Sequence, residues 1–278
     1  MTATVNEVGA GQGRRRFIAP LRGQVDAECF RHPVFDGYAD QRDLLTGADW
    51  PAIEALNARL ASPDRRFVAQ DAALLADGLH YETRIAQGRI ATREENWHDL
   101  FNALVWMRHP AIKQALNARQ CLHIARLGAS ERNPAQQALT QFDEFGVIVR
   151  VRDPALLLAW DRHDWPALFA PAGWRRGDIA VAAVIGHALM EQMLVPGRLL
   201  VGKCVVVHGE ADAAAVARVA AAITAGQVLA AASELRPLPL AGIPGWHPHQ
   251  DAAFLAQADY FRPLREGRRY PPVLAEPA

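Results

Sequence analysis

The densest group of side chains capable of acid–base or metal chemistry lies at 98–102, which contains His98, Asp99 and Asn102. Residues three or four apart lie on one side of a helix, so Asn102 would share a helix face with both His98 and Asp99. Imidazole titrates near neutral pH and a carboxylate can fix its tautomer, which suits a general base or a ligand of a divalent metal. A structural helix start, with Asp99 at the positive end of the helix dipole, explains the same residues. The sequence leaves both interpretations open.

Two further charged residues, Glu82 and Arg93, precede this helix on a segment with the composition of a β-hairpin. The β-forming residues of 81–85 and 90–92 flank a turn in which Gly88 can adopt the left-handed conformation. Strand geometry would let some of these side chains face the helix start. Arg93 could then hold a carboxylate or phosphate, or simply pair with a neighbouring acid.

Two later segments contribute similar chemistry. Asp143 and Glu144 are adjacent acids before a strand predicted at 147–151, where they could bind a metal or act as acid and base. A solvated turn would also contain such a pair. His187 and Glu191 are four apart on an apolar helix predicted over 178–194, so they would share a face. They could be ligands, or they could satisfy each other inside the core.

The run Asn96–Trp106, NWHDLFNALVW, resembles a bacterial family known only as domain of unknown function 3025. The resemblance covers most of the chain from about residue 30 on and implies no particular activity, cofactor or partner. The eleven residues of this run are its specific part. Weaker likeness extends to Tyr81-Glu82, Thr92-Arg93, Lys113, 116–119, Phe142-Asp143-Glu144, Gly146, 186–188, Gly202-Lys203 and 237–246.

Composition excludes several classes of protein. Thirty basic residues balance thirty acidic ones, so bulk charge gives no strong signal for nucleic acid or an anionic membrane. Cys29, Cys121 and Cys204 are widely spaced and form no C-x-x-C pair, which argues against a disulfide framework or a cysteine zinc site. The N-terminal residues lack the apolar core of a signal peptide, and the apolar run at 179–186 is too short to span a membrane. We therefore expect a cytoplasmic protein.

The spacing of apolar residues predicts a helix-rich α+β domain with a small sheet, including a β-hairpin packed on the following helix. Residues 1–16 are predicted to be a mobile tail and 17–278 a single domain. Its Pro- and aromatic-rich end, about 237–278, is predicted to lie over the core as a strap. The Ala-rich stretch 212–235 is expected to be the longest helix. The expected strands are too few and too irregularly spaced for a doubly wound sheet.

The preferred functional hypothesis is an enzyme, a metal-assisted hydrolase that acts on a small anionic substrate. In it, histidine is base or ligand, the acids hold or orient a divalent metal, and Arg93 grips the substrate. The sequence predicts neither the metal nor the oligomeric state. The expected pocket residues are Glu82, Arg93, His98, Asp99, Asp143, Glu144 and His187.

Two alternatives remain at this point. The first is a non-catalytic protein-binding module that uses the aromatic and Arg-rich C-terminal segment, because interfaces are enriched in these residue types. Its contact residues would be Trp246, Tyr260, Phe261, Arg262, Arg265, Arg268, Arg269 and Tyr270. The second is a nuclease of the ββα-metal type, suggested by a hairpin followed by a helix. The first strand lacks the Asp-His pair of that class, and the helix lacks its metal-ligand spacing.

Overall fold

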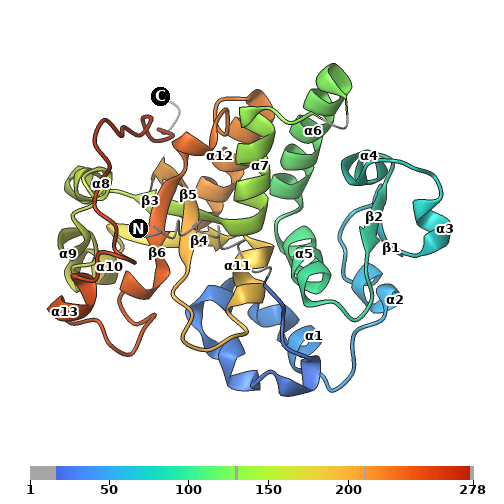
Figure 1. Ribbon diagram of the computed structural model, residues 1–278, viewed down its shortest axis with the longest axis horizontal. Helices are drawn as coiled ribbons and strands as arrows, with labels where there is room; N and C mark the ends of the chain where they lie inside the picture. The colour runs from blue at the N-terminus through green and yellow to red at the C-terminus, as the bar shows by residue number, and fades with distance from the viewer. Residues whose placement is uncertain (1–16, 129–130, 210, 276–278) are drawn as a thin grey trace, which may run out of the picture.

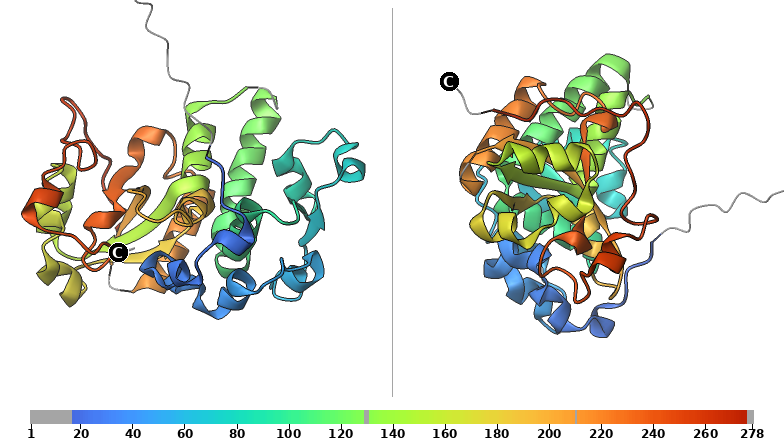
Figure 2. Two further views of the ribbon diagram at one scale, coloured as in Figure 1. Left: turned by 60° about the horizontal axis from the view of Figure 1, so that its bottom comes forward. Right: turned by 90° about the vertical axis from the view of Figure 1, so that its left-hand side faces the viewer.

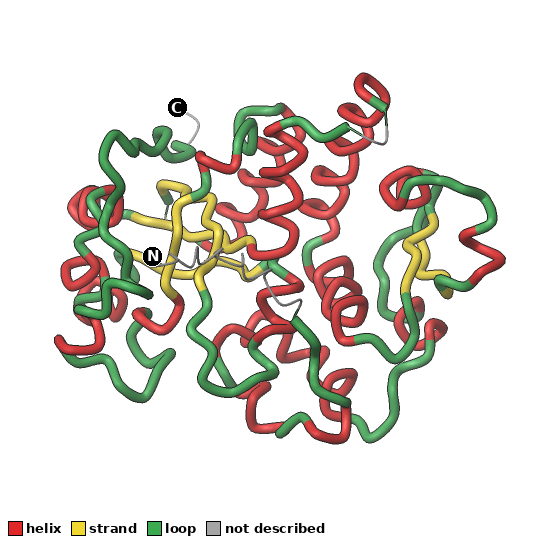
Figure 3. The backbone as a smooth tube through the Cα atoms, in the orientation of Figure 1, coloured by secondary structure: helices red, strands yellow, loops and turns green. Residues whose placement is uncertain are grey.

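The computed structural model describes residues 17–128, 131–209 and 211–275 of the 278-residue chain (Figure 1). The tail predicted at 1–16 lies outside these residues. The described residues form many helices and two small sheets, so the predicted helix-rich α+β class is confirmed. In Figure 3 the helices fill the space between the two sheets.

The larger sheet has four strands in the order β4-β3-β5-β6. They are β3 (Gly146–Val151), β4 (Ile179–Val184), β5 (Val201–His208) and β6 (Arg236–Pro239). The central pair, β3 and β5, is parallel, whereas β4 and β6 pair antiparallel at the two sides. The middles of β3 and β5 are continuous runs of Val and Ile that are buried, as expected for strands covered on both faces.

The smaller sheet corrects the predicted hairpin. Its strands, β1 (Arg66–Ala69) and β2 (Arg89–Thr92), are parallel, and the residues before β2 form the helix α4 (Tyr81–Ala86). His80 is the N-cap residue of α4, and its side chain accepts a hydrogen bond from the backbone N–H of Glu82. Gly88 has φ +85°, so the chain turns out of the helix directly into β2. The capped segment is helical despite its β-forming residues, because β-propensity depends strongly on context.

The central helix is α5 (Trp97–Arg108), in which ten of twelve residues are buried. A helix buried on nearly all sides belongs to the core. Rings from the N-terminal segment pack on it, with Phe35 stacked on Phe101 at 5.8 Å between centroids. The helices α6 (Pro110–Leu127), α7 (Pro134–Phe145), α11 (His187–Gln192) and α12 (Asp212–Ala225) pack around α5 or against the four-stranded sheet.

The remaining elements are short and surround this core. The described helices include none with both the length and the apolarity needed to cross a bilayer. The short elements are η1 (Arg22–Gln24), η2 (Ala27–Arg31), η3 (Pro33–Gln41), α1 (Arg42–Thr46), α2 (Ile53–Asn57), α3 (Ala72–Leu75), α8 (Pro154–Asp161), α9 (Trp165–Leu168), α10 (Pro171–Arg176), η4 (Ala232–Glu234), η5 (Leu240–Gly242) and α13 (Ala252–Leu255).

Two predicted helices differ from the structure. The helix expected over 178–194 is wrong in its first half, because Ile179–Val184 is strand β4 and only His187–Gln192 is helical. A short apolar run cannot by its period be assigned to strand or helix, and here pairing with β3 decides. The helix expected over 212–235 ends at Ala225, where Gly226 adopts a left-handed conformation. Among the described residues the longest helix is α6.

The C-terminal segment runs along the outside of the four-stranded sheet (Figure 2). The Tyr260 hydroxyl is buried and donates to the Leu200 carbonyl at 2.7 Å. Farther on, the segment pairs with β5 where β6 has ended. The Leu274 N–H donates to the Val206 carbonyl, and the Leu274 carbonyl accepts from the His208 N–H. These bonds attach the last described residues to the sheet.

The N-terminus of α11 lies directly against the end of α7. The backbone N–H groups of Ile185 and Gly186 both donate to the Gly146 carbonyl, at 2.8 and 2.9 Å. A Cβ atom on Gly186 would lie 2.6 Å from the Cα of Phe145, so only glycine permits this approach. The contact brings His187, the next residue, to the end of α7 that contains Asp143 and Glu144.

Gly186→Ala is therefore expected to lower the free energy of unfolding by roughly 1–3 kcal/mol, since the added methyl group forces two backbones apart. Gly37→Ala is the matched control. No atom lies within 4 Å of its Cβ position, so its stability should be unchanged or slightly higher. Urea unfolding followed by circular dichroism measures both. Equal stability of the two variants would contradict the close contact.

Candidate functional site

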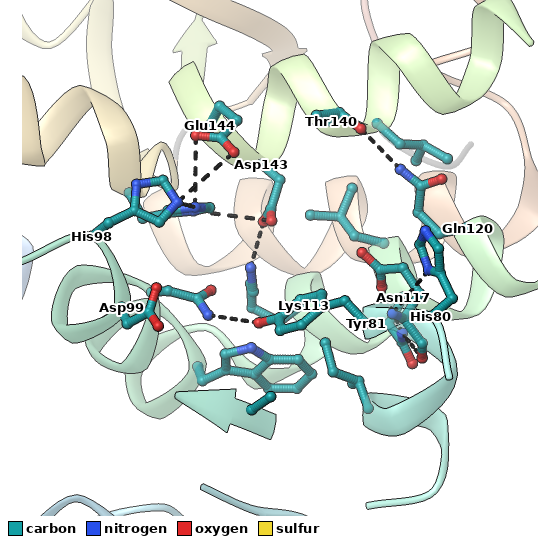
Figure 4. Close-up of a pocket in the computed structure, with 18 of the residues that line it drawn as sticks. His80, Tyr81, His98, Asp99, Lys113, Asn117, Gln120, Thr140, Asp143 and Glu144 are labelled. Atoms are coloured by element: carbon teal, nitrogen blue, oxygen red, sulfur yellow. Dashed lines mark hydrogen bonds and ion pairs between the residues drawn. The ribbon is translucent and has the colours of Figure 1, made fainter. Parts of the chain in front are cut away.

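A cavity of ≈ 400 Å³ lies between α4, α5, α6, α7 and the start of α11. In Figure 4, His98 and Glu144 lie at one end of it and His80, Gln120 and Thr140 at the other, with Lys113 between them. The structure places all seven residues of the expected pocket on its wall, although their catalytic roles stay predictions. They are Glu82, Arg93, His98, Asp99, Asp143, Glu144 and His187.

Two histidines face each other at one end of the cavity. The Nε2 atoms of His98, from α5, and His187, from α11, are 3.0 Å apart, with the rings nearly perpendicular. Nδ1 of His98 lies 3.0 Å from Oε2 of Glu191, which is thus placed to accept its proton. In the neutral ring this hydrogen bond leaves Nε2 of His98 with a free lone pair, directed at His187.

Glu144 completes a group of three potential metal ligands. Its carboxylate oxygens lie 3.7 Å from Nε2 of His187 and 3.9 Å from Nε2 of His98. One ligand atom from each of the three residues lies within 4.8 Å of the others. Ligand atoms around tetrahedral zinc are separated by about 3.3 Å, so shifts of less than about 1 Å in these side chains would bring all three separations to that value.

The two imidazoles differ in their affinity for a proton. Burial lowers the pKa of His187 to about 3, partly opposed by the charge of Asp143, while the charges of Lys113 and His98 lower it further. Burial also disfavours charge on His98, but the hydrogen bond to Glu191 and the charge of Glu144 outweigh it and raise the pKa of His98. At neutral pH His187 is therefore an uncharged ring.

Solvent reaches this end of the cavity. The side chains of His98, Asp143 and Glu144 are 27%, 25% and 31% exposed, whereas His187 is 5% exposed. Burial raises the pKa of the Glu144 carboxyl group, partly opposed by the charge of His98. The three potential ligands are thus accessible enough to admit an ion, and the most buried of them is the neutral His187.

Asp143 is held by a buried lysine. Nζ of Lys113, from α6, lies 2.5 Å from Oδ1 of Asp143, and the Lys113 side chain is only 5% exposed. Burial disfavours the Asp143 carboxylate, but the charge of Lys113 and its hydrogen bond lower the pKa of Asp143. Its second oxygen lies 3.9 Å from Nδ1 of His187. Lys113 therefore keeps a negative charge beside the buried imidazole.

Arg93 and Asp99 bind each other. Nε and Nη2 of Arg93 donate to the Asp99 carboxylate at 3.0 and 2.8 Å, and the Arg93 backbone N–H donates to it as well. This bidentate pair joins the end of β2 to the first turn of α5. The expected substrate-gripping role of Arg93 would require this pair to open.

Glu82 lies on the cavity wall contributed by α4. Its carboxylate accepts a hydrogen bond from Nδ2 of Asn117 at 2.7 Å, and burial raises its pKa. Next to it, the Tyr81 hydroxyl accepts a hydrogen bond from Nδ2 of Asn102 at 3.0 Å. Asn102, on the helix face expected from its spacing, thus contacts α4 and not a histidine.

The sequence interpretation missed several contacts and lining residues of the site. Glu191 was expected to form a hydrogen bond with His187, four residues earlier, yet it binds His98 on another helix.

Lys113, Asn117 and Gln120 all line the cavity from α6. Their spacing of four and then three residues on one helix was the available signal, since it marks a polar face. The other missed residues are Gln70, His80, Trp106, Arg132 and Thr140.

Three buried polar atoms on the cavity wall have no hydrogen-bond partner among the described residues. They are Oδ1 of Asn102, Nε1 of Trp106 and Nδ1 of His187. Most buried polar groups in folded proteins are hydrogen-bonded, and a bound ligand or water could satisfy these three atoms.

Comparison with known families agrees with the resemblance seen in the sequence. A family model described as protein of unknown function (DUF3025) matches residues 65–265. The chain belongs to the DUF3025 family. The matched residues include every helix and strand that contributes a potential metal ligand. No match was found among curated proteins or among solved structures.

The Lys113–Asp143 pair can be tested as a unit. Lys113→Met should lower the free energy of unfolding by roughly 3–5 kcal/mol, because it leaves the Asp143 carboxylate without its partner. Asp143→Asn should also destabilise the protein. The double variant should lose at least about 1 kcal/mol less than the sum of the two single losses. Chemical unfolding of all four proteins measures this coupling, and strictly additive losses would contradict it.

Proposed function

We propose that the protein is a metal-assisted hydrolase whose metal ion is bound by His98, Glu144 and His187. The observation that carries the proposal is the convergence of these residues, from three helices, at the solvent-accessible end of one cavity. Two histidines and one carboxylate are a ligand set used by catalytic zinc sites, in which the remaining position holds water. The bound metal would lower the pKa of that water and polarise the substrate.

Neighbouring groups support this ligand set. Glu191 accepts the Nδ1 hydrogen bond of His98, which is the arrangement that orients a metal-binding imidazole. Asp143 lies beside Nδ1 of His187 and is held there by Lys113. Glu191 is thus a positioning residue for His98, and Asp143 places a negative charge near His187. The neutral state of His187 also suits a ligand, since a metal binds the unprotonated imidazole.

The charge of the cavity explains why an anionic substrate would need the metal. Four acids line the cavity, and two of its three basic side chains, Lys113 and Arg93, are already paired. Arg132 lines it without an ion-pair partner among the described residues. We therefore assign substrate attraction to the metal and Arg132, in place of Arg93. Glu82, whose pKa is raised, would donate a proton to the leaving group.

Neither alternative gains support from the geometry. The comparison with ββα-metal nucleases began from a hairpin, and this segment is a helix followed by a strand. The protein-binding module stays a prediction, but its proposed contact residues Tyr260 and Phe261 are 9% and 3% exposed. Those rings belong to the protein's own core. The cytoplasm stays the predicted compartment on the sequence argument alone.

Metal uptake tests the ligand set. After incubation with zinc or manganese and desalting, elemental analysis should find about one equivalent in the wild-type protein, and His187→Ala and Glu144→Gln should lose it. Glu191→Ala should bind roughly 10–100-fold more weakly, because His98 loses the acceptor that orients it. His123→Ala is the control, since His123 contacts Asn133 and lies outside the cavity wall. Uptake unaffected by His187→Ala would reject the site.

Hydrolysis is tested separately with chromogenic substrates. The metal-loaded protein should release p-nitrophenol from p-nitrophenyl acetate or p-nitrophenyl phosphate faster than the metal-free protein, because a bound metal would activate water as a nucleophile near neutral pH. His187→Ala should reduce the rate to that of the metal-free protein, and His123→Ala should not change it. One equivalent of bound metal without any His187-dependent hydrolysis would leave a metal site but refute the hydrolase.

A further inference from the structure

A second and larger cavity, of ≈ 610 Å³, is formed by β5, β6 and the C-terminal segment 259–270. It shares no lining residue with the candidate metal site. Its wall contains four basic side chains and a single acid, Asp259. The basic residues are Lys203, Arg262, Arg265 and Arg268. This balance is the reverse of that in the first cavity, where acids outnumber bases.

The four cations have no carboxylate partner in the described part of the chain. Arg262 donates from Nε to the backbone carbonyl of Asp259 at 3.2 Å. Arg268 donates to the Ser233 carbonyl, and its guanidinium lies 4.5 Å from the Tyr270 ring centroid. These contacts fix two guanidinium groups in position without neutralising them. The structure thus maintains a positively charged wall.

Lys203 differs from Lys113 and Arg236, two other enclosed cations of this protein, in having no carboxylate partner among the described residues. Lys113 pairs with Asp143, and the buried Arg236, which also contacts Tyr270, pairs with Asp161. Lys203 is half-buried and has no such partner. Burial lowers the pKa of Lys203, and the charges of Arg268 and Arg262 lower it further. A bound anion would relieve the repulsion among these groups.

We propose that this cavity binds a small phosphate-bearing molecule. Guanidinium groups recognise phosphate oxygens in pairs, and a lysine adds a compact charge. The rest of the wall is largely apolar and suits the uncharged part of such a ligand. It includes Leu199, Val201, Leu235, Pro237, Pro239 and Pro263. The size of the cavity, on a chain with no net charge, favours a small ligand over a nucleic acid.

Calorimetric titration of the full chain with inorganic pyrophosphate, in EDTA to exclude metal-bound phosphate, tests the proposal. Wild-type protein should bind about one equivalent, and added salt should weaken binding. Arg265→Gln should weaken binding roughly tenfold or more, because one charge-assisted contact is lost. Arg265 is exposed, so this variant should fold. Lys203→Met should show a similar loss.

Two matched variants make the result specific. Arg126→Gln removes an exposed arginine outside the cavity and should bind pyrophosphate as wild type does. His187→Ala should also bind normally, which separates this site from the metal site. The proposal fails if pyrophosphate does not bind, or if Arg265→Gln and Arg126→Gln are affected equally. It also fails if a single-stranded oligonucleotide displaces pyrophosphate and binds tenfold more tightly, since the wall would then be a nucleic-acid groove.

Discussion

The candidate site depends on the close approach of two backbones, at Gly186 and Phe145. Without a side chain on Gly186, the start of α11 lies against the end of α7, and two N–H groups share the Gly146 carbonyl. Among the described residues, no longer series of backbone hydrogen bonds joins α11 to α7. The position of His187 relative to Asp143 and Glu144 is therefore set by packing, which transmits small displacements because protein interiors are dense.

This contact brings the buried imidazole of His187 close to the Asp143 carboxylate, and burying such polar groups costs free energy. His187 and Lys113 are both buried, and each lies close to an Asp143 oxygen. Isolating any of the three from water is unfavourable, and the Lys113–Asp143 ion pair offsets this for two of them, whereas Nδ1 of His187 has no hydrogen-bond partner among the described residues. The 3.0 Å contact between the Nε2 atoms of His187 and His98 orients the imidazole. These contacts make the residues interdependent, so none can be interpreted alone.

The sequence predicted the fold class and the residue types of the site better than it predicted which residues contact one another. Strands such as 147–151 and capped helices such as 154–161 follow from local signals. The helix α4 was missed because its cap is a histidine, a residue that is rarely used for this purpose, and β4 was missed because its run suits either state. Contacts such as His98–Glu191 join residues far apart in the chain, so spacing along one helix suggested the wrong partner.

The pairing of Leu274 with β5 has a consequence for the behaviour of the protein at high concentration. Strand β6 covers only the first half of β5, from Val201 to Cys204, and the rest would present unpaired N–H and C=O groups. Exposed strand edges recruit strands from other molecules and lead to aggregation. By hydrogen-bonding across Val206 to His208, the C-terminal residues occupy that edge. The segment around Leu274 thus protects this edge of the sheet from association with other copies.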